Sequence, residues 1–181
     1  MIRQKQSVAL MLVAIILVAL GIVTRFVPHP ANFTAIGAVG IFAGAVMPKK
    51  WAIVIPVVAM ALSDIFLGFH SLMVFTWGCM MLAAGIGLLI RQSMKPRIIL
   101  LGSLLASVQF FLITYWAVWM FTPLYSKGLD GLFASYVAGL PFFRNMIVGD
   151  LVYTAALFCV YALALVLIQR RQRVPVAYLK K

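Results

Sequence analysis

The stretch MIVGDLVYTAALFCVYALALVLI, from Met146 to Ile168, is 23 residues long and contains a single charged residue, Asp150. About 20 consecutive apolar residues are enough for a helix to cross the hydrocarbon core of a bilayer, so this stretch predicts a transmembrane helix. A carboxylate inside such a helix is unfavourable in lipid and usually belongs to a functional site. The number of similar helices and the surroundings of Asp150 therefore decide both fold and function.

The composition extends the membrane prediction to the whole chain. The 181 residues are 65% hydrophobic and 10% charged, whereas soluble domains are about 45–50% apolar. The acids are Asp64, Asp130 and Asp150, and there is no Glu. We therefore expect one all-α integral membrane domain over residues 1–181, with lipid around most of its surface.

Five further apolar runs precede the first stretch, so that six transmembrane helices are predicted. The second run is short for a span. It is therefore tilted, extended by its flanking residues, or buried among the other helices. The predicted spans cover residues 7–24, 34–47, 51–68, 71–90, 98–121 and 146–168.

The basic residues predict the orientation of these spans. The net charge is +12, and Lys and Arg form short clusters between the runs, which is typical of topology signals and not of a nucleic-acid-binding face. Six spans place 12 basic residues on one side and 3 on the other. The positive-inside rule then puts both termini in the cytoplasm. A cleaved signal peptide is the alternative for the first run, but its 18 apolar residues exceed the usual length of about 7–15.

The segment before the sixth span carries a helical pattern of its own. Apolar residues recur there with helical spacing, and Pro141 is expected to end the helix. The sequence therefore predicts an amphipathic helix over about 130–140 in the last outer loop, lying at the membrane surface or as a lid. The stripe consists of Leu129, Leu132, Phe133, Tyr136, Val137 and Leu140.

The predicted orientation gathers polar residues toward the outer face. Asp64 and Asp150 are each expected about 6 Å inside the outer end of their helices, and Arg144 directly precedes the sixth span. We expect Arg144 to pair with Asp64 beside Asp150. This cluster is either a substrate site or a structural clamp with Asn residues as N-caps. The remaining outer polar residues are His29, Asn32, His70 and Asn145.

Two other residue types have two interpretations each. The aromatic residues Trp77, Tyr115 and Trp119 fall in the outer part, as an interfacial belt or as the wall of a site for a flat organic ligand. The second run is rich in small residues, which serve internal helix packing or the docking of another membrane subunit. Its glycines are Gly37, Gly40 and Gly44.

Familiar catalytic motifs are absent from the sequence. There is no GxxxxGK[ST], GxSxG or HExxH, and no His/Cys spacing typical of a metal site. We therefore expect no enzyme activity, no metal site and no cofactor. An aspartyl dyad of Asp64 and Asp150 is disfavoured, because a nearby Arg144 would keep both acids ionised.

Three segments resemble an uncharacterised family of small bacterial membrane proteins. They are RFVPHPANFTAIGAVGIFAGA (Arg25–Ala45), VAMALSDIFLGFHSLMVF (Val58–Phe75) and LYSKGLDGLFASYVAGLPFFRNMIVGDLVYTAALF (Leu124–Phe158). That family in turn resembles the substrate-binding (S) components of energy-coupling-factor transporters. The resemblance implies an inner-membrane protein that binds a vitamin-like micronutrient near the outer face and docks onto a transmembrane coupling subunit with two ATPases.

The chain departs from S components in two places. Its first span lacks their Ala-x-x-x-Ala surface, so the expected docking residues are Ala31, Ala35 and the three glycines of the second run. It begins Met-Ile-Arg and not Met-His, which disfavours nickel or cobalt as the substrate.

The sequence thus predicts a subunit that captures a small organic micronutrient for uptake. A non-transporting scaffold or assembly subunit with a structural polar cluster is the alternative. A ligand-sized outer cavity would favour capture, and solid packing there would favour the scaffold. The expected binding residues are Asp64, Arg144, Asp150, Asn145, His29, Asn32, His70, Trp77, Tyr115 and Trp119.

Overall fold

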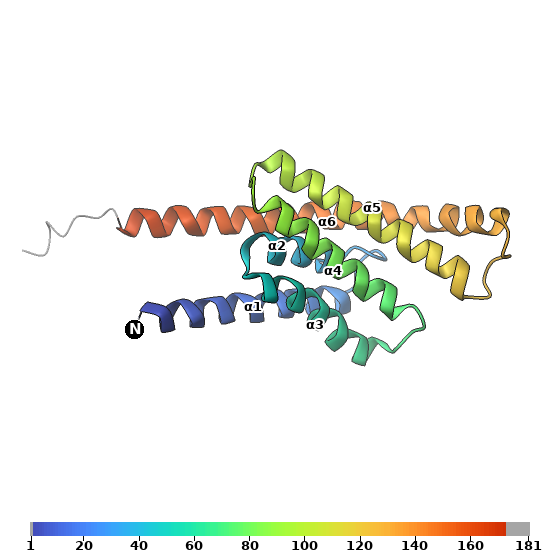
Figure 1. Ribbon diagram of the computed structural model, residues 1–181, viewed down its shortest axis with the longest axis horizontal. Coiled ribbons are helices and arrows are strands. Elements are labelled where there is room, and N and C mark those ends of the chain that lie inside the picture. The colour runs from blue at the N-terminus through green and yellow to red at the C-terminus, as the bar shows by residue number, and fades with distance from the viewer. Residues whose placement is uncertain (1, 173–181) are drawn as a thin grey trace, which may run out of the picture.

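The computed structural model describes the backbone of residues 2–172 and the side chains of residues 8–170. In this part the chain is all-helical, as predicted, and has no strand. Five helices are long and apolar enough to cross a bilayer. The helices are α1 (Ile2–Phe26), α2 (Ile36–Val46), α3 (Lys49–Leu67), α4 (Met73–Ile90), α5 (Pro96–Phe121) and α6 (Leu129–Gln172) (Figure 1). Part of the predicted C-terminal basic cluster lies outside the described residues, namely Arg173, Lys180 and Lys181.

Helix α2 is the short element inside the bundle. Its 11 residues extend about 16 Å, roughly half the thickness of a bilayer core. Every residue from Ile36 to Ala45 is buried, and the helix contacts all five others. A helix that is apolar on all sides belongs in a protein interior. Of the three options predicted for this short run, the structure therefore has burial among the other helices.

Helix α2 crosses α4 at a pair of glycines. A Cβ on Gly44 would lie 2.7 Å from the Cα of Gly87, closer than real Cβ atoms approach. Arg91 at the end of α4 donates hydrogen bonds to the carbonyl oxygens of Gly44, at 2.7 Å, and of Met47. Carbonyls in the last turn of a helix have no partner within it. The small residues and Arg91 therefore hold α2 against α4.

Helix α6 differs most from its prediction. It is one helix of 44 residues, about 66 Å long, with Pro141 inside it. The expected loop helix is thus the first part of α6, and the prediction that Pro141 ends it is wrong. Most of the predicted apolar stripe does not pack, since Leu129 is 83% exposed and Phe133 is 73% exposed.

The face that packs on α5 holds Ser135, Gly139 and one residue of the stripe, Tyr136. The Ser135 hydroxyl donates to the carbonyl oxygen of Tyr115 at 2.9 Å, and the Tyr136 hydroxyl donates to that of Leu112 at 2.9 Å. A Cβ on Gly139 would clash with the Tyr115 ring. Membrane helices associate through small residues because apolar side chains are already well solvated by lipid. The exposed part of the stripe is therefore the face that a lipid would cover.

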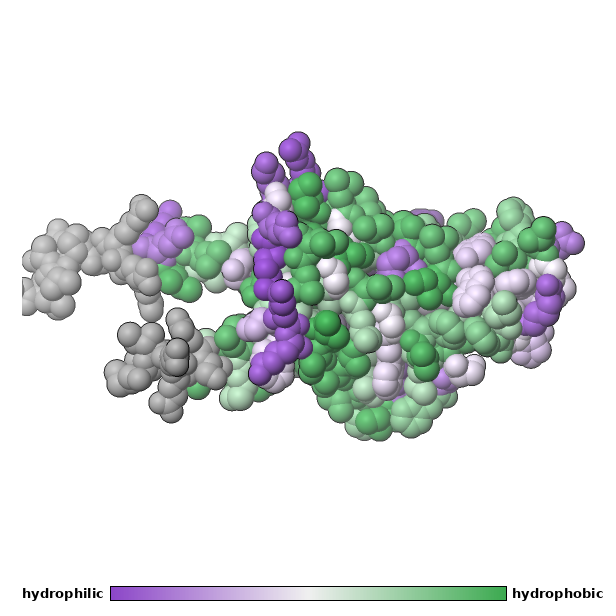
Figure 2. Space-filling view, in the orientation of Figure 1, coloured by the Kyte–Doolittle hydropathy of each residue, from purple (hydrophilic) through white to green (hydrophobic). Residues whose placement is uncertain are grey.

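The two ends of the bundle differ in charge. Helix α1 begins and α6 ends on the left of Figure 1, and the α2–α3 and α4–α5 connections face the same side but lie further in, toward the middle of the picture. A stripe of hydrophilic side chains crosses the bundle there, and green, hydrophobic side chains cover much of the face beyond it (Figure 2). We name this the basic end, from Lys49, Lys50, Arg91, Lys95 and Arg97. The opposite end, with the other three connections, is the loop end.

Candidate functional site

A cavity of about 320 Å³ lies among the helices toward the loop end. The connections contribute His29, Asn32 and His70 to its lining, while Gly37 of α2 and Asp150 of α6 line its inner part. Its volume is near the lower limit of the roughly 300–1,000 Å³ typical of small-molecule sites. Much of the remaining wall is apolar, with Met60, Met80, Ala83, Ala106, Phe110 and Met146.

Asp150 is the buried acid of this cavity. Its side chain is 4% exposed, and the Ser107 hydroxyl donates to its Oδ2 at 2.7 Å. A Cβ on Gly37 would lie 2.9 Å from the Asp150 Cγ and closer still to Oδ1. Glycine at the second position of α2 is thus what lets the carboxylate approach the start of that helix, where free N–H groups and the helix dipole favour negative charge.

Asp150 lies deeper than the sequence predicted. Because α6 starts at Leu129, Asp150 is 21 residues, or about 31 Å, along its helix and not about 6 Å. Its partner Ser107 is 11 residues after the start of the 26-residue α5, close to the middle of that helix. The carboxylate therefore sits well inside the helix bundle, where an ionised group is costly unless something compensates its charge.

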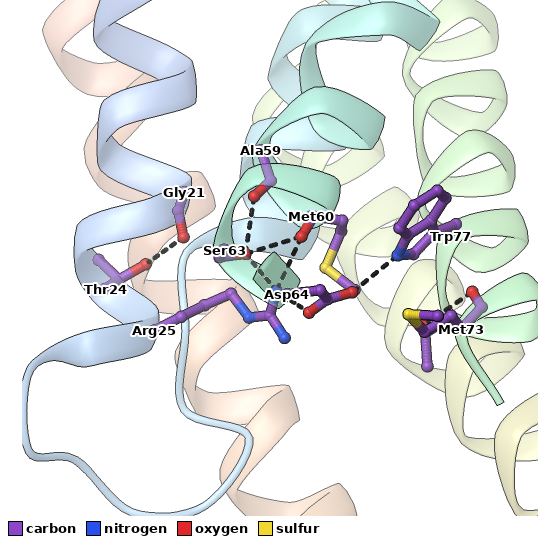
Figure 3. Close-up of polar contacts among 10 residues, drawn as sticks. Gly21, Thr24, Arg25, Ala59, Met60, Ser63, Asp64, Met73 and Trp77 are labelled. Carbon is purple, nitrogen blue, oxygen red and sulfur yellow. Dashed lines mark hydrogen bonds and ion pairs between the residues drawn. The ribbon is translucent and has the colours of Figure 1, made fainter. Parts of the chain in front are cut away.

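The second buried acid, Asp64 of α3, has an ion-pair partner at one oxygen and a hydrogen-bond donor at the other. Arg25 at the end of α1 approaches it with Nη1 at 2.7 Å from Oδ1, and the Trp77 indole N–H donates to Oδ2 at 2.8 Å. The same Nη1 also donates to the Ser63 hydroxyl and to the Met60 carbonyl oxygen. Figure 3 shows these groups converging from α1, α3 and α4.

Arg25, and not Arg144, is therefore the partner of Asp64, and the predicted Arg144–Asp64 pairing is wrong. Arg25 also lines the cavity. Arg144 is exposed on α6. In the described part of the chain, Arg25–Asp64 is the one ion pair, so Asp150 has no basic partner there.

The model of a family of unknown function, DUF6580, matches residues 3–175. The chain belongs to this family. No curated protein and no solved structure matches it.

The cavity brings together some of the residues predicted for this DUF6580 protein and leaves others apart. Asp150, His29, Asn32 and His70 line it. Asp64 lies behind Arg25, bonded to Trp77. Two other expected residues donate hydrogen bonds from a helix to a loop: Asn145 to the Ala31 carbonyl oxygen at 3.2 Å and Trp119 to the Ser126 carbonyl oxygen at 2.9 Å. The Tyr115 ring packs against Phe111 on the same helix, α5.

The predicted aromatic wall therefore does not line the cavity of this protein. Trp77, Tyr115 and Trp119 are absent from its lining, which instead has the Phe110 ring and three methionines. Methionine side chains are flexible and polarisable, and they adapt to apolar groups of different shape. The wall thus suits an apolar or aromatic body without fixing its outline.

Sequence analysis missed two polar residues of the DUF6580 site. Arg25 was counted only as a topology signal, although it is the single Lys or Arg between Lys5 and Lys49. Ser107 follows Ser103 by four residues, which places both hydroxyls on one face of α5. That face meets α6 twice, since Ser103 also lies 3.2 Å from the Thr154 hydroxyl. The polar stripe that Ser103 and Ser107 form within an apolar span could have identified Ser107 from the sequence.

The expected docking residues lie mostly inside this DUF6580 bundle. Gly37, Gly40 and Gly44 are buried, against α6 or α4. Ala35 is also buried, at 0% exposure, whereas Ala31 is exposed in the α1–α2 connection. The glycines therefore serve internal helix packing, which was the other interpretation of the small-residue pattern.

Proposed function

We propose that this protein binds a small organic solute in the cavity and serves as the substrate-capture subunit for its uptake across a bacterial cell membrane. The observation that carries the proposal is the cavity itself. It has a ligand-sized volume, polar residues from two connections, and an acid without a basic partner in the described part of the chain. A ligand-sized cavity was the expected mark of a binding protein, and solid packing that of a scaffold. The proposal assigns binding and no reaction.

The charge distribution supports an orientation for this role. Basic residues favour the cytoplasmic side, so the basic end would face the cytoplasm and the loop end the outside. The cavity would then open where a capture subunit meets its solute. Single cysteines at Lys127 and Lys95, in a chain with Cys79 and Cys159 replaced by Ser, test this. A membrane-impermeant maleimide should label position 127 and spare position 95 in intact cells, and the opposite pattern would reverse the orientation.

The proposal also includes a partner that supplies energy. The sequence has no phosphate-binding loop, so ATP would be used by a separate coupling module. The resemblance to S components suggests a transmembrane coupling subunit of that kind. Because the glycines of α2 are buried, such a subunit would contact other, exposed surfaces.

A thermal-shift screen of the full-length protein in detergent tests solute binding directly. The panel would contain vitamins, nucleobases and small amines, each over a range of concentrations. A solute present at 100 times its dissociation constant stabilises the folded state by about 2.7 kcal/mol. We expect at least one to raise the unfolding temperature in wild type and in Asp130→Asn, whose exposed acid lies far along α6 from the cavity. If no member of a broad panel binds, the capture function is wrong.

A structural role is the second candidate, and one observation favours it. The Asp64 cluster is closed by its own partners, which is what a clamp between α1, α3 and α4 requires. If the whole protein were a scaffold, the cavity would be incidental. Substitutions that fill it, such as Ala106→Phe, would then leave its cellular role intact.

A further inference from the structure

The charges of the cavity do not balance. Of the charged groups at its wall, the Arg25 guanidinium is matched by the Asp64 carboxylate at 2.7 Å. Asp150 has no such match in the described part of the chain. With Arg25 and Asp64 counted together, an ionised Asp150 gives the site one uncompensated negative charge.

The neighbours of Asp150 compensate this charge only in part. The Ser107 hydroxyl gives one hydrogen bond, to Oδ2. The start of α2 at Gly37 adds a partial positive charge of about half a unit. Buried charges in proteins are normally paired with a full opposite charge or bound to a metal. Asp150 is 4% exposed and has neither partner in the described part of the chain.

The rest of the cavity matches a particular type of partner for this acid. Phe110, Met60, Met80 and Met146 line the same cavity as Asp150. Aromatic faces attract cations, and methionine sulfur packs well on aromatic rings. An apolar or aromatic body that carries a positively charged nitrogen would satisfy both the acid and the wall.

We infer that the solute carries a protonated basic nitrogen, as in an amine or amidine, and that this nitrogen binds the Asp150 carboxylate. The inference rests on the proposed function, because it names the chemical class of the captured solute. The bond would be charge-assisted, and such bonds are shorter and roughly twice as strong as neutral ones. Ser107 would remain on Oδ2 and hold the carboxylate in place, which leaves the other lone pairs of the carboxylate for the solute.

Benzamidine is a suitable probe, because its flat amidinium can form two parallel bonds to a carboxylate. Its matched controls are benzamide, which has the same shape without the charge, and benzoate, which has the opposite charge. Binding to the full-length protein in detergent would be measured by titration calorimetry and thermal shift. We expect benzamidine to bind and both controls to bind at least about tenfold more weakly, as expected when a bond to a charged group is lost.

Two variants locate the binding. Asp150→Asn should weaken benzamidine binding by about 10- to 100-fold, while Asp130→Asn leaves it unchanged. Met146→Lys gives a second test that keeps Asp150. Residue 146 lies four positions before Asp150 on α6 and lines the cavity, so its ammonium group would occupy the place of the solute's nitrogen. It should abolish benzamidine binding.

The outcomes separate this inference from the proposed function. Benzamide or benzoate binding as tightly as benzamidine would overturn the inference and leave capture of a solute in place. Benzamidine binding that survives both Asp150→Asn and Met146→Lys would also overturn it, since the amidinium would then bind elsewhere. If neither these probes nor any vitamin or nucleobase binds, the proposed function fails as well.

Discussion

Two acids are buried in this protein, and their surroundings differ. Asp64 is 1% exposed and receives the Arg25 guanidinium on one oxygen and the Trp77 indole on the other. Asp150 is 4% exposed and has one hydroxyl, from Ser107, on one oxygen. Burial alone therefore does not identify a binding group. An acid whose oxygens are all engaged by its own chain holds helices together, whereas an acid with spare capacity at a cavity is available to a solute.

Removing the cation from the Asp64 cluster should have the largest effect. Arg25→Ala leaves Asp64 buried without its charge partner, which lowers the free energy of unfolding by about 3–5 kcal/mol. Denaturant or thermal unfolding in detergent measures this. Arg144→Ala is the matched control, since Arg144 is exposed and should change stability by no more than about 0.5 kcal/mol. Equal effects of the two substitutions would contradict the Arg25–Asp64 assignment.

Removing the second partner of Asp64 should have a smaller effect. Trp77→Phe keeps most of the ring but loses the N–H that donates to Oδ2, so the free energy of unfolding should fall by about 1.5–3 kcal/mol. Trp119→Phe loses an exposed bond to the Ser126 carbonyl oxygen and should cost less. If Trp119→Phe proves the more damaging of the two, Asp64 does not depend on Trp77.

Crowding Asp150 should affect stability less than breaking the Asp64 pair. In Gly37→Ala the new Cβ would press on the Asp150 carboxyl group. Overpacking of this kind lowers the free energy of unfolding by about 1–3 kcal/mol. Gly85→Ala in α4 is the control, because its Cβ would meet nothing within 4 Å and should be neutral or stabilising by about 0.5–1 kcal/mol. Solute binding should fall in the first variant and persist in the second.

Sequence patterns predicted much of the fold and less of the site. The first five helices lie within about five residues of the predicted spans at each end, because hydropathy reports directly on long apolar segments. The prediction divided α6 at Pro141, because the rule that proline ends a helix comes from helices exposed to water. In α6 the proline is tolerated within a helix that packs on α5.

The partners of the two acids required the three-dimensional arrangement. Arg25 is separated from Asp64 by 39 positions, and Ser107 from Asp150 by 43. No local pattern predicts such pairs, because they depend on how the helices pack. The sequence identified both acids as important, but it gave Asp64 the wrong cation and placed Asp150 too close to the start of its helix.

The central claim is that Asp64 is structural and that Asp150 binds the solute. The most direct test is thermal unfolding of wild type, Asp64→Asn and Asp150→Asn, each with and without saturating benzamidine. Asp64→Asn should unfold at a clearly lower temperature yet still be stabilised by benzamidine. Asp150→Asn should unfold within a few degrees of wild type, because an amide can still accept from Ser107, and should gain nothing from benzamidine. The account is contradicted if Asp150→Asn retains the benzamidine-induced stabilisation, or if both variants lose stability and binding to the same extent.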